Sequence, residues 1–192
     1  TPGFLFQQNS LRDALVAGST FNIFNNHAAR VKMANIAQTI NVLQAMILTD
    51  KEKMILTPTY HVFEMYTAHH DATLLPSKIE TAEYAFAGEK IPAVNVSASR
   101  DKAGKIHVTL CNLNPNTAAE VSLELQGATA NKLSGRALTS GQMTAHNTFE
   151  KPDAGIRADL AAFERVVDTH TVFVSHSPVL GLLDAGFGGT QI

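Results

Sequence analysis

Three side-chain amides stand at three-residue spacing within the apolar stretch "ANIAQTINVLQAMIL": Asn35, Gln38 and Asn41. A buried amide without a hydrogen-bond partner costs about 1–3 kcal/mol. Each of these amides is therefore expected either to be satisfied within the protein or to face a ligand. Whether each amide bonds within the protein or to a ligand depends on the secondary-structure elements around it.

The histidines of "AHHDA" raise the question of a metal site, because His69, His70 and Asp71 are adjacent. Neighbouring residues on a helix point about 100° apart and rarely share one ion. The chain has no His-x-x-x-His pair and a single cysteine. We therefore predict neither a metal nor another cofactor, and we expect a helix C-terminus whose negative end favours imidazolium.

The other reactive groups have structural interpretations. Cys111 falls in the middle of a predicted strand, with no helix N-terminus to lower its pKa, so we expect a buried thiol. "GFGGT" lacks the Lys-Ser/Thr of a phosphate loop and is expected to be a flexible tail. The acids of the N-terminal part fall at helix starts, turns or polar helix faces, where salt bridges or solvation are expected: Asp13, Asp50, Glu52 and Glu64. No catalytic acid/base pair is predicted.

Composition narrows the class of protein. Of 192 residues, 45% are hydrophobic and 17% charged, which is ordinary for a globular protein. A net charge of −2 gives no electrostatic case for binding nucleic acid or an anionic membrane. No apolar run reaches the roughly 18 residues of a spanning helix. A lone cysteine fits a reducing cytoplasm. The start, "TPGFLFQQNS", resembles neither an initiator nor a signal peptide, so we expect a piece of a longer protein.

The first 72 residues show an α/β pattern. Ser10 followed by Asp13 predicts a cap for a helix over 11–24. "RVKMANIAQ", residues 30–38, is typical of a short buried strand. A second helix is predicted with Thr57 as its cap and Pro58 at its first position, where the missing N–H does no harm. Helix, buried strand, loop and helix indicate a unit with a parallel sheet.

From residue 73 to 192 the period changes to two, which predicts an all-β domain. Alternation over 94–99, 106–111 and 121–126, with polar turns "RDKAGK" and "NLNPNT" around the second strand, favours an antiparallel β-sandwich. We place the domain boundary between 72 and 73.

Gln38 closes the predicted strand and opens the loop that follows. Ligands of parallel α/β sheets meet the carboxyl ends of the strands, and an amide there can both donate to and accept from a sugar hydroxyl. The alternative is a hydrogen bond from Gln38 to the loop backbone, and the pattern favours neither. Asn35, within the strand, is expected to be structural, and Asn41 a turn residue.

Three stretches closely resemble the C-terminal part of the α-L-arabinofuranosidases of glycoside hydrolase family 51: "NSLRDALVAG", "FNIFNNHAARVKMANIAQTINVLQAMILTD" and "KMILTPTYHVFEMY…HHDATLLP". The resemblance is dense over residues 2–76, looser to "AHNTFEKPDA", and thin beyond 155. It implies the last portion of a (β/α)₈ barrel in 1–72, followed by a sandwich that also uses strands from before the barrel.

The resemblance also implies a retaining glycosidase with two catalytic glutamates. In the family one follows an Asn and the other precedes a Trp, and this chain has no Asn-Glu pair and no Trp. Both are therefore expected upstream of Thr1, which leaves the chain without turnover by itself. The Gln of "NIAQT", here Gln38, is implied to bind arabinose, with Asn35 and His27 near the same rim.

Partners follow from the same resemblance. The expected partners are arabinofuranosyl saccharides, the upstream part of the enzyme, and further copies, since family members form hexamers. A competing interpretation is a non-catalytic sandwich for carbohydrate binding or subunit assembly. The absence of Trp and an aromatic fraction of 7% leave little for sugar stacking.

Overall fold

The computed structural model describes residue 7, residues 9–37, 39–128 and 130–152, and the backbone of three later strands. Two helices, α1 (Leu11–Asn26) and α2 (Pro58–Tyr66), come early, and a 3-10 turn, η1 (Thr67–His69), extends α2. The strands are β1 (Ile47–Asp50), β2 (Lys53–Leu56), β3 (Thr73–Leu75), β4 (Glu83–Phe86), β5 (Glu89–Pro92), β6 (Val94–Arg100), β7 (Ile106–Asn112), β8 (Glu120–Glu124), β9 (Ala130–Thr139), β10 (Arg157–Leu160), β11 (His170–Val174) and β12 (Gly181–Gly189).

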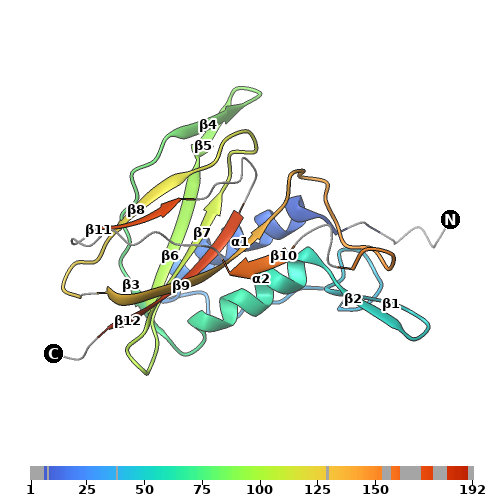
Figure 1. The fold of residues 1–192 in the computed structure, drawn as a ribbon, viewed down its shortest axis with the longest axis horizontal. Helices are drawn as coiled ribbons and strands as arrows, with labels where there is room; N and C mark the ends of the chain where they lie inside the picture. Colours follow the sequence, from blue (N-terminus) through green and yellow to red (C-terminus); the bar gives the residue numbers. More distant parts are fainter. Residues whose placement is uncertain are drawn as a thin grey trace.

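Six strands form one antiparallel sheet in the order β10-β9-β12-β7-β6-β3. β8 pairs with β11 in a separate sheet, and β1–β2 and β4–β5 are hairpins. Figure 1 shows the β4–β5 hairpin projecting at the top and the β1–β2 hairpin at the right. The predicted antiparallel strands are therefore confirmed, while their assignment to a complete sandwich stays a prediction.

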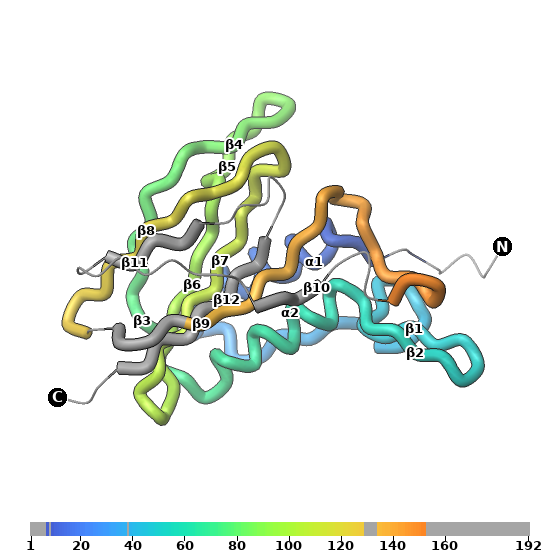
Figure 2. Tube along the Cα trace, in the orientation of Figure 1, coloured from blue at the N-terminus to red at the C-terminus, as the bar shows by residue number. Residues whose placement is uncertain are grey.

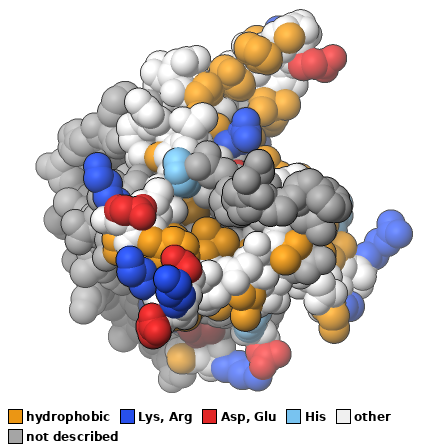
Figure 3. Space-filling model, turned by 90° about the vertical axis from the view of Figure 1, so that its right-hand side faces the viewer, with side chains coloured by type: hydrophobic (Ala, Val, Ile, Leu, Met, Phe, Trp, Pro, Cys, Tyr) orange, Lys and Arg blue, Asp and Glu red, His pale blue; other side chains and the backbone are white. Residues whose placement is uncertain are grey.

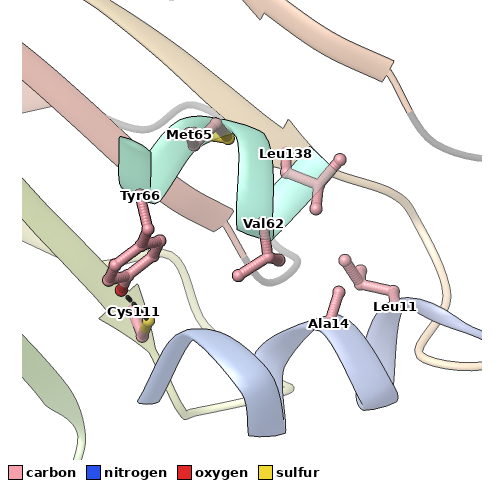
Figure 4. Close-up of a cluster of buried hydrophobic side chains, with 7 residues drawn as sticks. All are labelled: Leu11, Ala14, Val62, Met65, Tyr66, Cys111 and Leu138. Atoms are coloured by element: carbon pink, nitrogen blue, oxygen red, sulfur yellow. Dashed lines mark hydrogen bonds between the residues drawn. The ribbon is translucent and has the colours of Figure 1, made fainter. Parts of the chain in front are cut away.

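The two faces of the large sheet are covered by different layers. On one face the two helices pack on β7 and β9 through a buried cluster (Figure 4): Leu11, Ala14, Val62, Met65, Tyr66, Cys111 and Leu138. The other face packs against β8 through the side chains of Val94, Ile106, Val108, Leu110, Val121 and Leu123. The first cluster takes residues from both sides of the predicted 72/73 boundary, and the boundary itself stays a prediction.

Both helices begin where the caps predict. Asp13 accepts hydrogen bonds at Oδ2 from the Ser10 backbone N–H (2.8 Å) and hydroxyl (2.7 Å). Pro58 is the first residue of α2, but the Thr57 hydroxyl donates to the Ala45 carbonyl at 2.9 Å and makes no side-chain cap to the helix. Thr57 therefore holds the start of α2 against the chain before β1.

The buried strand predicted over residues 30–38 is not formed in this structure, and Gln38 lies outside the described residues. Residues 31–36 have no regular secondary structure, Asn35 is exposed, and Met33 is 76% exposed. A strand needs neighbours for its N–H and C=O groups. Residues 31–36 belong to none of the described ladders, and the bridge between Ile40 and Ile47 lies beyond the predicted strand.

The glycine-rich end is also different from its prediction as a flexible tail. Residues 186–189 of this stretch belong to β12, which pairs with β7 on one side and β9 on the other, and Thr190 lies outside the described residues. Pairing with β9 over the whole stretch, and with β7 as far as Phe187, compensates for the weak strand preference of glycine. In the described part of the chain, α1 with 16 residues and α2 with 9 are both shorter than a membrane-spanning helix.

Candidate functional site

The connecting segment, defined here as residues 27–46, runs from the end of α1 to β1 (Figure 2) and carries the predicted binding residues. His27 is the C-cap of α1 and is exposed, with its backbone N–H donating to Ile23 and Phe24 carbonyls at 3.1 Å. Asn35 is exposed, and no described hydrogen bond joins it to His27. Gln38 lies outside the described residues, so its predicted sugar contact stays a prediction.

Asn41 is a turn residue, as predicted. Its φ is +61°, in the left-handed region that Asn tolerates better than most residues. Its side-chain Oδ1 accepts from the Thr49 N–H at 2.6 Å, and its Nδ2 donates to the Thr49 hydroxyl at 2.8 Å. Because both the oxygen and the nitrogen of the Asn41 amide are hydrogen-bonded to Thr49 of β1, we do not assign this side chain to ligand binding.

The end of the connecting segment is anchored by buried polar groups. Asn9, 3% exposed, donates from Nδ2 to the Gln44 carbonyl at 3.1 Å and accepts from the Thr59 hydroxyl at 2.9 Å. Together with the bond from Thr57 to Ala45, these contacts tie residues 44–45 to the first turn of α2. Ala45 is fully buried as a result.

The beginning of the segment is anchored by an amide row, defined as Asn22, Asn25 and Asn26 at the end of α1. All three Nδ2 groups donate to β6: Asn22 to the Asn95 carbonyl (3.2 Å), Asn25 to the Ser97 hydroxyl (3.1 Å) and Asn26 to the Val96 carbonyl (2.9 Å). The last turns of α1 are therefore fastened to one strand of the large sheet.

Asn22 is fully buried and its Oδ1 is the centre of a hydroxyl cluster. The hydroxyls of Tyr66, Ser97 and Thr109 each lie 2.8 Å from this oxygen as donors. The Tyr66 hydroxyl also lies 2.8 Å from the Gly18 carbonyl, and Figure 4 shows the ring pointing from α2 toward Cys111. A polar network thus joins both helices to β6 and β7.

His69 continues this network and corrects the prediction of an imidazolium at the helix end. Its Nδ1 lies 2.7 Å from the Ser99 hydroxyl and its Nε2 lies 3.1 Å from the Thr109 hydroxyl. Burial lowers the pKa of His69 to about 4, and the charges of His107 and His70 act in the same direction. With Thr109 donating to Asn22, the neutral ring with its proton on Nε2 satisfies every partner.

The four acids of the N-terminal part each have a structural or a surface role. Glu64 on α2 accepts both guanidinium bonds of Arg136 on β9, at 2.7 and 2.8 Å, and these bonds lower the pKa of Glu64. Asp13 caps α1, while Asp50 and Glu52 are exposed around the β1–β2 turn. The prediction that these acids form salt bridges, caps or solvated surface is confirmed.

Cys111 is the buried thiol that the strand position predicts. It is fully buried in β7, and burial raises the pKa of its thiol to about 12. The Tyr66 hydroxyl lies 3.8 Å from its sulfur. A thiol with so high a pKa is not a nucleophile near neutral pH.

A hollow of about 460 Å³ lies beside the first part of the connecting segment. Its walls combine phenyl rings with polar side chains: Phe21, Phe24, Phe63, Asn25, Lys32 and Asp71. Asp71 is the single carboxylate among its lining residues, whereas glycoside hydrolysis uses two. The hollow can hold an apolar group, but its described walls supply no acid/base pair.

Sequence reasoning missed the amide row and the hydroxyl cluster. One local signal was available, because three of the last five residues of α1 are asparagine, a residue that helix interiors disfavour. Alternating Ser and Thr on β6 and β7 gave no comparable signal, since polar alternation is equally typical of a solvated sheet face.

Comparison with known proteins identifies the family. Residues 1–172 match the model of the α-L-arabinofuranosidase C-terminal domain. An intracellular exo-α-L-arabinofuranosidase of Bacteroides ovatus is 45% identical over 152 residues, which are 79% of this chain and 30% of that protein. An exo-α-(1→6)-L-arabinofuranosidase of Bifidobacterium longum is 27% identical over 93% of this chain and 35% of its own length.

Solved structures agree in fold. The crystal structure of the family 51 arabinofuranosidase from Xanthomonas axonopodis superimposes with a TM-score of 0.90 at 42% identity, over 97% of this chain and 37% of that one. An α-L-arabinofuranosidase from Thermotoga maritima, solved with arabinose, gives a TM-score of 0.78 at 23% identity over 95% and 40% of the two chains. This chain spans about a third of the length of these relatives. Its two helices and following antiparallel strands therefore belong to the family 51 α-L-arabinofuranosidases, as their C-terminal domain.

Proposed function

We propose that this chain is the C-terminal portion of a retaining α-L-arabinofuranosidase that releases terminal non-reducing arabinofuranosyl groups from arabinan, arabinoxylan and their oligosaccharides. The observation that carries the proposal is the match at 42% identity and a TM-score of 0.90 over nearly the whole chain. The B. ovatus relative, at 45% identity, is named as an exo-acting enzyme of this kind.

The chain's own part in the reaction is binding and not bond cleavage. A retaining mechanism needs a nucleophile and an acid/base carboxyl about 5–5.5 Å apart. The acids of the N-terminal part form caps, surface groups or the Glu64–Arg136 pair, which supports catalytic glutamates elsewhere in the enzyme. Gln38, with Asn35 and His27, forms one wall of the arabinose subsite in this proposal.

The exposed connecting segment supports assigning residues 1–72 to the last part of a (β/α)₈ barrel. It carries an apolar strand-like pattern between two helices, yet Met33 and Ile40 are 76% and 51% exposed. Neighbouring barrel strands would cover these side chains and take up the backbone groups of residues 31–37. Residues 73–192 then form the sandwich, and the enzyme acts in the cytoplasm, as its B. ovatus relative is named intracellular.

An activity assay tests the proposal. The complete enzyme that carries this region is expected to hydrolyse an aryl α-L-arabinofuranoside, and the 192-residue chain alone is not. Gln38→Ala in the complete enzyme is expected to raise KM more than it lowers kcat, because it removes hydrogen bonds to the bound sugar. Asn116→Ala, an exposed turn substitution, is the control. Turnover by the purified chain alone would disprove the division of roles.

Subunit assembly is the second candidate function, favoured by the β4–β5 hairpin. Tyr84, Phe86 and Ile91 share one face of this hairpin, with Phe86 73% and Ile91 43% exposed. Figure 3 shows hydrophobic side chains along the arm that projects at the top of the molecule. A lone two-stranded hairpin is marginally stable in water and its exposed apolar face needs cover, and this candidate function assigns that cover to a second copy. Light scattering should show the complete enzyme as an oligomer that Phe86→Lys dissociates, whereas Ala85→Lys, on the opposite face of the hairpin, leaves it intact.

A further inference from the structure

The amide row at the end of α1 is unfavourable for the helix itself. Asparagine has a low helix preference, because its side chain competes with the backbone for hydrogen bonds. Here Asn22, Asn25 and Asn26 occupy three of the last five helical positions. The helix preference of asparagine therefore disfavours these three residues here. Their compensating stabilisation has to come from the groups that their amides contact.

All three amides contact one strand, and at adjacent positions. Their Nδ2 groups donate to residues 95, 97 and 96 of β6 at 2.9–3.2 Å. Asn22 is fully buried at the centre of the hydroxyl cluster, whereas Asn26 is exposed. The row thus reaches from the core to the surface along β6 and fixes both the position and the rotation of the helix end.

The connecting segment leaves α1 directly after this row. The N–H of Ala28 donates to the Asn25 carbonyl at 3.0 Å, and those of Arg30 and Val31 donate to the His27 carbonyl at 2.9 Å. These three bonds form the exit turn, and their acceptors sit within or next to the amide row. The orientation of the helix end therefore sets the direction in which residues 32–37 start.

We infer that the amide row is a positioning device, in which β6 sets the exit direction of the connecting segment and so the placement of Asn35 and Gln38 against the arabinofuranosyl group. This inference rests on the proposed function. In this inference β6 contributes to substrate binding without touching the sugar. Asn25 and Asn26 act through the segment and are positioning residues.

The double substitution Asn25→Ala/Asn26→Ala in the complete enzyme separates positioning from helix stability. Alanine is the best helix former, so a role confined to the helix predicts equal or greater stability. The Ser97 hydroxyl keeps its hydrogen bonds to Asn22 and Thr109, so the substitution leaves no buried hydroxyl without a hydrogen-bond partner. Positioning predicts faster hydrogen exchange at the N–H groups of Ala28, Arg30 and Val31, and a KM raised about three- to tenfold with kcat changed less than about twofold.

Thr20→Ala is the matched control. Its hydroxyl donates to the Val16 carbonyl of its own helix at 2.7 Å, so this change also adds an alanine to α1 but removes no contact with β6. It is expected to leave both the exit-turn exchange and KM unchanged. Faster exchange and raised KM in the double variant, with neither in Thr20→Ala, supports the inference.

Two results would overturn it. One is exit-turn exchange in the double variant equal to that of the unsubstituted enzyme. The other is faster exchange without a rise in KM while Gln38→Ala does raise KM, because the exit direction would then not reach the sugar. An unsubstituted enzyme with no arabinofuranosidase activity would instead refute the proposed function, and the exchange comparison would still decide whether the row positions the segment.

Discussion

The two faces of the β6–β7 pair are both buried but are built from opposite chemistries. The register places Val96 opposite Leu110 and Ala98 opposite Val108 on the face toward β8. The same register places Ser97 opposite Thr109 and Ser99 opposite His107 on the face toward the helices. One face is an apolar contact surface, and the other is a set of hydrogen-bonding groups under α1 and α2.

The two faces differ in how strictly each one fixes the position of the layer packed on it. Apolar burial is roughly proportional to area and has no direction, so this face holds the β8 layer through close packing and not through the geometry of donors and acceptors. Hydrogen bonds need a donor and an acceptor at one distance and angle, and an unpaired buried partner is costly. The polar face therefore fixes the rotation and height of the helices, and with them the start of the connecting segment.

The largest effect is expected from removing the centre of the polar face. Asn22→Leu keeps the side chain bulky but removes the acceptor of three hydroxyls and the donor to the Asn95 carbonyl. We expect the free energy of unfolding to fall by about 3–5 kcal/mol, measured by urea unfolding. Asn116→Leu in an exposed turn is the control. A loss below about 1 kcal/mol would show that the polar face adds little to stability.

The matching change on the apolar face is expected to be somewhat smaller. Leu110→Ala removes a side chain that is 4% exposed and leaves a cavity against β8, at a cost of about 2–4 kcal/mol. Leu110→Met, which nearly conserves volume, should lose less than about 1.5 kcal/mol. If Leu110→Ala destabilised the chain more than Asn22→Leu, the ranking of the two faces would be reversed.

The two faces should also differ in pH dependence, because the histidine lies on the polar one. The folded-state pKa of His69 is about 4, below its ordinary 6.5, so the unfolded chain binds more protons between these values. The contribution of neutral His69 to the free energy of unfolding is therefore fully present above pH 6.5. It falls by about 2–3 kcal/mol as the pH approaches 4. His69→Gln should flatten urea midpoints across this window. An unchanged slope in His69→Gln would mean that another group titrates there.

The smallest effect is expected at the edge that joins α2 to β9. Glu64→Gln weakens the bidentate contact with Arg136 and should lower the free energy of unfolding by about 0.5–1 kcal/mol. Since the pKa of Glu64 is lowered, this contribution is present above its ordinary 4.5 and is lost as the pH falls below it. Glu83→Gln, which affects the exposed pair with Lys90, should change nothing measurable. If Glu64→Gln and Glu83→Gln lowered the free energy of unfolding equally, the Glu64–Arg136 contact would be worth no more than an exposed ion pair.

Elements with strong local signals could be predicted from sequence. The cap at Ser10 and Pro58 at the first position of α2 located both helices. Period-two alternation located β6, β7 and β8. These predictions succeeded because capping and face alternation depend on residues within a few positions of one another.

The candidate site was less predictable. Asn41 was recognised as a turn residue because its short amide suits a left-handed backbone. The exposure of Asn35 and the neutral His69 could not be foreseen, since each depends on neighbours distant in sequence. His69 meets Ser99 and Thr109 across 30 and 40 residues, and only that environment makes the charged ring unfavourable.

By itself, the sequence determined where helices start, which strand residues share a face, and which family the chain resembles. The tertiary structure alone decided that the polar face of β6–β7 is buried, that residues 186–189 lie within a paired strand, and that residues 31–36 form no strand. The physical reason is that a backbone N–H or a buried amide is satisfied by whatever partner lies beside it, and such partners come from elsewhere in the chain.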